Sequence, residues 1–95
     1  MSDGRKDDAG KNRMDLLPFE ALEEIARVLT YGAKKYAPNN WQKVPDAKER
    51  YEAALLRHFS AHKRGEKNDP ESGLSHLAHV GCNALFLIWL QDKTD

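Results

Sequence analysis

The chain has 95 residues, in which 15 basic and 15 acidic side chains cancel to a formal net charge of zero. A chain of this length supports one hydrophobic core, and its neutrality gives no general attraction for nucleic acid or anionic membranes. The single cysteine, Cys82, excludes an internal disulfide and a cysteine-only zinc site. We therefore expect one small cytoplasmic domain that meets anionic ligands through local cations or a bound metal ion.

Charge and hydropathy divide the chain into a tail and a helical domain. Residues 1–15 contain no apolar stretch, so we predict a flexible charged tail there and a single all-α domain over residues 16–95. The longest apolar stretch, Leu77 to Leu90, is interrupted by His79 and Asn83 and is shorter than the roughly twenty apolar residues that cross a bilayer. We expect no membrane partner.

The first predicted helix runs from Pro18 to Tyr36. Pro18 suits the first turn of a helix. Apolar residues then recur at intervals of three and four, which is typical of an amphipathic helix. They are Leu22, Ile25, Ala26, Leu29 and Ala33. A polar loop, APNNWQKVP, follows this helix.

The second predicted helix runs from Asp46 to Gly65. Asp46 followed three residues later by Glu49 has the spacing of a capping box, and Gly65 is a natural helix stop. The loop GEKND follows.

The third predicted helix begins at a cap on Asp69 or Ser72 and ends near Gln91. It is apolar on nearly all sides, and three helices of which one has this character do not close a monomeric bundle. The pattern predicts a small all-α bundle that is completed by oligomerisation to a dimer or tetramer.

Two acidic groups have spacings that suit a divalent metal. Glu20 and Glu24 are like charges at i and i+4, an unfavourable pair unless a cation lies between them. Glu66 and Asp69 place two oxygen ligands within reach of one Mg²⁺ or Mn²⁺ ion. The alternatives are a solvated helix face for the first group and a helix N-cap at Asp69 for the second.

All four histidines are predicted to point inward. His76, His79 and Asn83 fall along one side of the third helix, while His58 and His62 lie on the inner face of the second. Buried polar groups need partners, which internal hydrogen bonds or waters supply in the simplest interpretation. A zinc site also fits the His-x-x-His spacing, and imidazoles that orient ligands of a harder metal are a third interpretation.

A cationic and aromatic segment closes the first helix. Lys34, Lys35 and Tyr36 precede Asn40 and Trp41, which together supply groups that hold phosphates and stack on a base. The alternative for Trp41 is a plain core anchor.

Two strings carry a family resemblance: TYGAKKYAPNNW and LLRHFSAHKRGEKNDPESGLSHLAHVGCNALFL. Over residues 16–90 the chain resembles the bacteriophage dATP/dGTP diphosphohydrolases called MazZ, relatives of the all-α MazG-like nucleotide pyrophosphohydrolases. The resemblance implies hydrolysis of purine deoxynucleoside triphosphates to monophosphate and pyrophosphate with Mg²⁺ or Mn²⁺. It also implies a place in phage nucleotide metabolism, in the host cytoplasm, that supports 2-aminoadenine DNA synthesis.

The residues and the resemblance together give the expected site. The expected catalytic residues are Glu24, Glu66 and Asp69. The expected metal ligands are Glu20, Glu24, Glu66, Asp69 and His79. The expected substrate contacts are Lys34, Lys35, Tyr36, Asn40, Trp41, Arg57, His58, His76 and Asn83.

The acidic pairs depart from the pattern of the MazG-like enzymes. There, Glu-x-x-Glu is followed after a modest gap by Glu-x-x-Asp, whereas here the whole second helix separates Glu20-x-x-Glu23 from Glu66-x-x-Asp69. Ligands from His76, His79 and Asn83 on the third helix could replace one of the usual pairs. Two other functions also stay open. One is a non-catalytic helical oligomer that binds a nucleotide or a metal, and the other is a phosphohydrolase whose metal is held by His58, His76 and His79.

Overall fold

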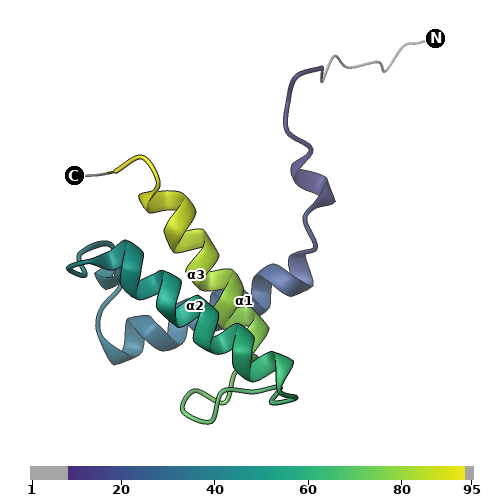
Figure 1. The fold of residues 1–95 in the computed structure, drawn as a ribbon. Coiled ribbons are helices and arrows are strands. Elements are labelled where there is room, and N and C mark those ends of the chain that lie inside the picture. The colour runs from purple at the N-terminus through teal and green to yellow at the C-terminus, as the bar shows by residue number, and fades with distance from the viewer. Residues whose placement is uncertain (1–8, 94–95) are drawn as a thin grey trace.

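Three α-helices form the domain (Figure 1). The structure, a computed structural model, describes residues 9–93. The helices are α1 (Phe19–Lys35), α2 (Ala47–Lys63) and α3 (His76–Leu90), with 3-10 turns η1 (Met14–Leu16) and η2 (Asn40–Gln42). These described residues contain no strand and only one isolated bridge, between Asn68 and Ser75. The predicted all-α class is confirmed.

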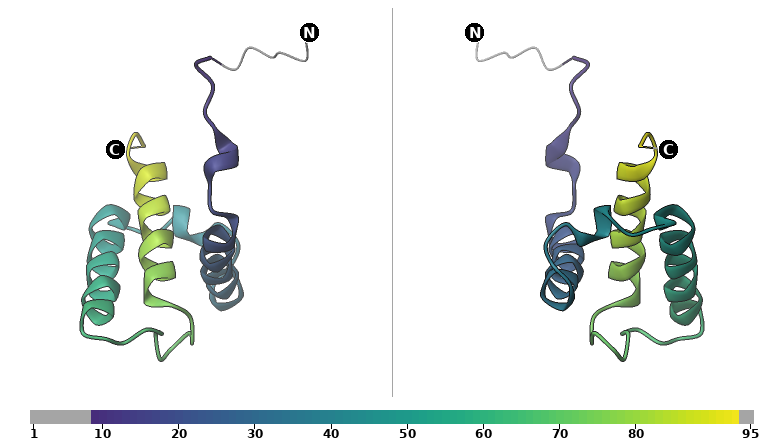
Figure 2. Two further views of the ribbon diagram at one scale, coloured as in Figure 1. Left: turned by 90° about the vertical axis from the view of Figure 1, so that its right-hand side faces the viewer. Right: turned by 90° about the vertical axis from the view of Figure 1, so that its left-hand side faces the viewer.

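The N-terminal segment leads away from the helices (Figure 2). Residues 9–18 are exposed, and Arg13 pairs with Asp15 at 2.8 Å next to η1. Residues 1–8 of the predicted tail lie outside the described residues, so the flexibility of residues 1–15 stays a prediction.

The start of α2 differs from its predicted cap. Asp46 is the residue before the helix, but its φ is 54° and its side chain makes no capping hydrogen bond. A capping side chain requires an extended backbone that directs its oxygen at the first free N–H groups, and the left-handed conformation of Asp46 does not provide it. The predicted capping box with Glu49 is therefore wrong.

The third helix begins later than predicted. Ser75 is its N-cap, and the Ser75 hydroxyl accepts hydrogen bonds from the N–H groups of Leu77 and Ala78 at 3.1 and 3.3 Å. Asp69 instead closes a turn in the loop, where its N–H donates to the Leu74 carbonyl at 2.7 Å. This turn, with Gly73 at a φ of 75°, holds the chain out of helical conformation until Ser75.

Helix α3 lies between the other two helices and contacts both (Figure 2). The buried core at the α1 side consists of Val28, Ala78 and Cys82, with Ile25, Leu29, Leu74 and Phe86 packed against it. Gly81 permits the close approach of the helices, because a Cβ there would lie 2.7 Å from the Ile25 Cδ1 atom. The predicted stripe of α1 was partly wrong: Val28 is its buried residue, whereas Ala26 is exposed.

Several apolar side chains of α3 remain at the surface. Leu77, Leu85, Ile88 and Trp89 are between 38% and 64% exposed.

Among the described helices, none combines the length and the apolar character that a membrane crossing requires.

Candidate functional site

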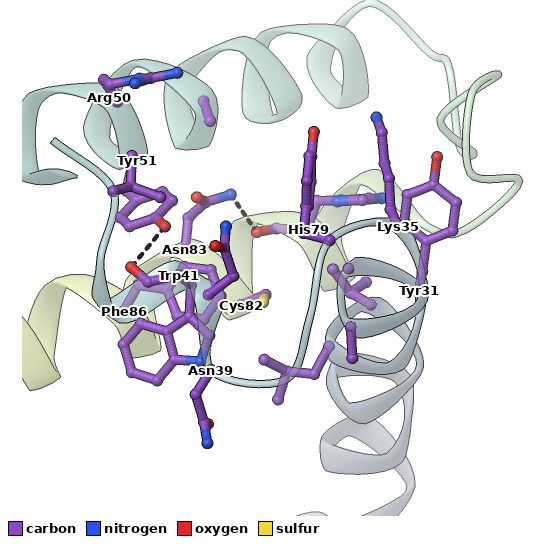
Figure 3. A pocket seen from close by; sticks show the side chains of 18 of the residues that line it. Tyr31, Lys35, Asn39, Trp41, Arg50, Tyr51, His79, Cys82, Asn83 and Phe86 are labelled. Atoms are coloured by element: carbon purple, nitrogen blue, oxygen red, sulfur yellow. Dashed lines mark hydrogen bonds between the residues drawn. The ribbon is translucent and has the colours of Figure 1, made fainter.

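A pocket of about 1130 Å³ opens above α3, between the end of α1 and the first part of α2. Loop residues 36–45 form another wall of it, and Asp69 and Glu71 reach it from the loop before α3. Pockets for small molecules are usually about 300–1,000 Å³ in volume, so this one is large enough for a nucleotide. Figure 3 shows side chains from all three helices around it.

One end of the pocket contains the Lys35 ammonium and is called the cationic end. Tyr31 and Lys35 lie one turn apart on α1 and both line the pocket (Figure 3). The Lys35 ammonium forms an ion pair with Glu71 Oε2, and the Tyr31 hydroxyl donates to the same oxygen at 3.1 Å. This pairing raises the pKa of Lys35 and lowers the pKa of Glu71, so both groups are charged.

The other end of the pocket is aromatic. The Trp41 and Phe86 rings stack with centroids 4.4 Å apart and planes 13° apart, and Trp89 meets Trp41 edge-on at 4.9 Å. The Tyr51 hydroxyl donates to the Trp41 carbonyl at 2.8 Å. Trp41 therefore anchors η2 to α3, which is the structural role left open from the sequence, and it also lines the pocket.

The floor of the pocket contains a buried amide. Asn83 is 7% exposed, and its Nδ2 donates to the His79 carbonyl at 2.8 Å. A carbonyl only accepts, so this contact fixes which amide atom is nitrogen. Within residues 9–93, Asn83 Oδ1 has no hydrogen-bond donor. Asn83 Oδ1 is thus an acceptor without a partner among these residues, and buried acceptors require one.

Beside the floor, two imidazoles face each other. The Nδ1 atoms of His58 and His76 are 2.8 Å apart, and His76 Nε2 lies 2.7 Å from Glu66 Oε1. Metal-ligand atoms of His58, Asp69 and His76 all lie within 4.8 Å of one another. Helix α2, the loop and the first residue of α3 therefore converge at one point.

Asp69 and His79 connect this cluster with the pocket. The Asp69 carboxylate accepts the Ser72 N–H at 2.9 Å, and Ser72 Oγ lies 2.8 Å from His79 Nε2. Burial opposes ionisation of Asp69, but the hydrogen bonds from Ser72 outweigh it and hold its pKa below the ordinary value. The His79 ring stacks on His58 at 4.2 Å, and burial lowers the pKa of both imidazoles.

The structure brings most of the expected site residues together. Those that line the pocket are Lys35, Tyr36, Asn40, Trp41, Arg57, His58, Asp69, His79 and Asn83. Glu66 and His76 do not line the pocket; His76 contacts His58, and Glu66 contacts His76. Lys34 lies outside this pocket, beside a shallower surface depression.

The acidic residues of α1 lie apart from the cluster. Glu20 and Glu24 are exposed and do not line the pocket, and Glu24 pairs with Arg27 at 3.3 Å. Among the described residues, the one group of three or more His, Cys, Asp or Glu side chains close enough to share a metal ion contains neither Glu20 nor Glu24. Glu20 and Glu24 therefore lie on a solvent-exposed helix face, which is the alternative given for them from the sequence.

Three pocket residues carry little signal in the sequence. Tyr31 precedes Lys35 by one turn, a spacing that places both on one face. Glu71 is typical of a carboxylate in a first helical turn, which hides its contact with Lys35. Phe86 lies in an apolar run, where an aromatic residue indicates a core position.

Comparison with known proteins gives one family. The sequence profile described as dATP/dGTP diphosphohydrolase, N-terminal, matches residues 1–95. Over 87 residues the chain is 38% identical to the dATP/dGTP diphosphohydrolase of Salmonella phage PMBT28. This match covers 92% of the chain and 29% of the phage protein. The chain thus spans less than a third of this relative. No solved structure matches the chain. The chain belongs to the family of dATP/dGTP diphosphohydrolase N-terminal domains.

Proposed function

We propose that the domain binds a purine deoxynucleoside triphosphate in the pocket and takes part in its hydrolysis to monophosphate and pyrophosphate with Mg²⁺ or Mn²⁺. The name of the phage relative supports the substrate class. The observation that carries the proposal is the polarity of the pocket, which has Lys35 at one end, an aromatic group at the other and the Asp69 cluster alongside.

The cationic end is proposed to hold the triphosphate. Lys35 and Arg57 both line the pocket, and ammonium and guanidinium groups form strong, charge-assisted hydrogen bonds with phosphate oxygens. The chain is neutral overall, so these local cations are its means of attracting a polyanion. In this proposal a phosphate oxygen competes with Glu71 for the Lys35 ammonium.

The floor and the aromatic end are proposed to hold the base. Asn83 Oδ1 is a buried acceptor, which suits the exocyclic amine of adenine or the N–H groups of guanine. Trp41 and Tyr51 add flat apolar surface, on which a purine ring stacks. A ligand without a donor at this point would leave Oδ1 unpaired. Cytosine and thymine also carry N–H donors, so the proposed source of purine preference is the larger stacking area of a purine on the aromatic end.

A divalent ion fits beside the pocket rather than on α1. Asp69 supplies a carboxylate and His58 and His76 supply imidazoles, whereas Glu20 and Glu24 stand apart. A bound ion would neutralise phosphate charge and generate a nucleophile from water. Asp69 is ionised and held by Ser72, so its oxygens are in place to accept a proton or to bind a cation.

Turnover and binding test the proposal together. The chain is incubated with each of the four deoxynucleoside triphosphates and Mn²⁺, and monophosphate and pyrophosphate are separated by ion-exchange chromatography. Calorimetry measures binding in parallel. We expect dATP and dGTP to bind, and Asp69→Asn and Glu66→Gln to abolish turnover while Glu52→Gln, on the exposed side of α2, retains it. Absence of purine nucleotide binding would refute the proposal.

The chain is also proposed to form a homo-oligomer. Leu56 and Phe59 on α2 and Leu85 and Ile88 on α3 are 43% to 64% exposed, and exposed large apolar side chains favour association when they form a contiguous patch. Light scattering coupled to gel filtration should give twice or four times the mass of one chain, and Ile88→Glu should reduce this measured mass.

The wider role, support of 2-aminoadenine DNA synthesis in a phage, is proposed from the family resemblance. This role requires that dGMP is among the products of hydrolysis.

A further inference from the structure

We propose that His58, Asp69 and His76 bind one divalent transition metal ion, and that Glu66 orients His76 toward it. This inference deepens the proposed function by naming its metal site. It stands on the geometry of the side chains, and its test uses no nucleotide, so the two proposals can fail separately.

The three side chains come from different elements and meet at a distance that suits one ion. His58 lies in the C-terminal half of α2, Asp69 in the loop and His76 at the start of α3. Their ligand atoms are within 4.8 Å of one another. Ligands that lie about 2.1 Å from a metal are roughly 3–4 Å from each other, so small side-chain adjustments complete the site.

The contacts of His76 leave its Nδ1 available as a ligand. A carboxylate only accepts, so Glu66 Oε1 at 2.7 Å places the proton of neutral His76 on Nε2. The lone pair of Nδ1 then points at His58 Nδ1, 2.8 Å away. Metal-bound histidines characteristically hydrogen-bond a carboxylate through the other ring nitrogen, and Glu66 occupies that position.

The surroundings hold these ligands in place. His76 is 3% exposed, and its backbone N–H donates to the Lys67 carbonyl at 2.9 Å. The Asp69 carboxylate is fixed by the Ser72 N–H at 2.9 Å. His58 stacks on His79 with planes 8° apart. Fixed ligands lose little side-chain entropy when they bind an ion.

The donor set selects the class of metal. Two imidazole nitrogens and one carboxylate oxygen suit Mn²⁺, Fe²⁺, Co²⁺ or Zn²⁺, whereas Mg²⁺ is usually held by oxygen atoms alone. Three protein ligands leave positions for water or phosphate oxygens. His79, expected from the sequence to be a ligand, has its Nε2 3.9 Å from Asp69 Oδ2 and 2.8 Å from Ser72 Oγ, so we assign it a supporting role.

Cobalt titration tests the site directly. Protein freed of metal with a chelator is titrated with Co²⁺, and visible absorption reports ligation by nitrogen and oxygen. We expect saturation at one equivalent, at least tenfold weaker binding in His58→Gln and Asp69→Asn, and roughly 10- to 100-fold weaker binding in Glu66→Gln. His62→Gln, one turn beyond His58 on α2 and outside the cluster, is the matched control.

Nuclear magnetic resonance of the unaltered protein tests the same site without substitutions, so it does not depend on whether the variants fold. In the unaltered protein, substoichiometric Mn²⁺ should broaden the ring proton signals of His58 and His76 more than those of His62. Circular dichroism identifies variants that have lost their helices. Equal Co²⁺ affinity in the unaltered protein, His58→Gln and Asp69→Asn, or broadening that spares His58 and His76, would overturn the assignment.

Discussion

Lys35 on α1 and Glu71 in the loop before α3 form an ion pair at the cationic end of the pocket, and Tyr31 donates to the same carboxylate oxygen at 3.1 Å. The ammonium group proposed to bind phosphate is thus already paired with a carboxylate of the same chain. The side chains of Lys35 and Glu71 are 42% and 63% exposed, and such solvent-accessible pairs exchange easily with other partners. A bound triphosphate would therefore compete with Glu71 for Lys35.

We expect Glu71→Gln to bind inorganic triphosphate about two- to fivefold more tightly than the unaltered protein. The substitution removes the competing carboxylate and one negative charge from the pocket, while glutamine keeps the side-chain volume. Isothermal calorimetry at low ionic strength measures the change, which should shrink as salt is added. Weaker binding in the variant would show that Glu71 helps to form the phosphate site.

Two adjacent lysines provide a matched test of the cationic end. Lys35→Gln should weaken binding of inorganic triphosphate about tenfold, because a charge-assisted hydrogen bond is lost. Lys34→Gln changes the net charge equally, but Lys34 lies outside the pocket and should have less than a twofold effect. Equal losses in the two variants would assign the effect to general charge, and a larger loss in Lys34→Gln would exclude Lys35 as the phosphate ligand.

Helix positions were predictable where the sequence pattern is local. The spacing of Leu22, Ile25 and Leu29 predicted α1 within one residue at each end. The start of α3 was not predictable, because Asp69, Ser72 and Ser75 are all good caps, and a turn closed by backbone hydrogen bonds decides among them. Long-range backbone contacts of this kind leave no periodic signal.

The sequence predicted which residues belong to the candidate site better than it predicted which of them lie close together. Lys35, His79 and Asn83 could be found because their helical faces follow from spacing. The meeting of His58, Asp69 and His76 could not, since it depends on the path of the loop between α2 and α3. The acidic spacing of Glu20 and Glu24 suited a metal equally well, but within residues 9–93 no second element brings ligands to α1 there.

Two glycines should respond oppositely to alanine. Gly65 ends α2 with a φ of 95°, so Gly65→Ala should lower the free energy of unfolding by about 1–2 kcal/mol. Gly32 lies within α1, where an added Cβ would meet no atom within 4 Å, and Gly32→Ala should raise that free energy by about 1 kcal/mol. Urea denaturation followed by circular dichroism measures both. A stabilised Gly65→Ala would show that the left-handed conformation is absent in solution.

The Cys82 thiol should resist alkylation in the folded protein. Cys82 is 2% exposed, and burial raises its pKa from 9.0 to about 12. Only the thiolate reacts rapidly with iodoacetamide, so at pH 8.5 the folded chain should react at least about 100-fold more slowly than the chain in urea. Mass spectrometry follows the modification. Equal rates in the two states would mean that the α1 and α3 interface opens readily.

The same group makes stability depend on pH. Between pH 9 and 12 the unfolded chain releases the Cys82 proton while the folded chain retains it, so the free energy of unfolding falls as pH rises. Below pH 9 both states are protonated and this contribution is fully present. Urea midpoints at pH 8 and 10.5 should therefore differ more in the unaltered protein than in Cys82→Ala, in which the thiol is absent and lysine titration remains. An equal decline in both proteins would place the thiol in contact with solvent, because only an exposed thiol ionises at the same pH in the folded and unfolded chains.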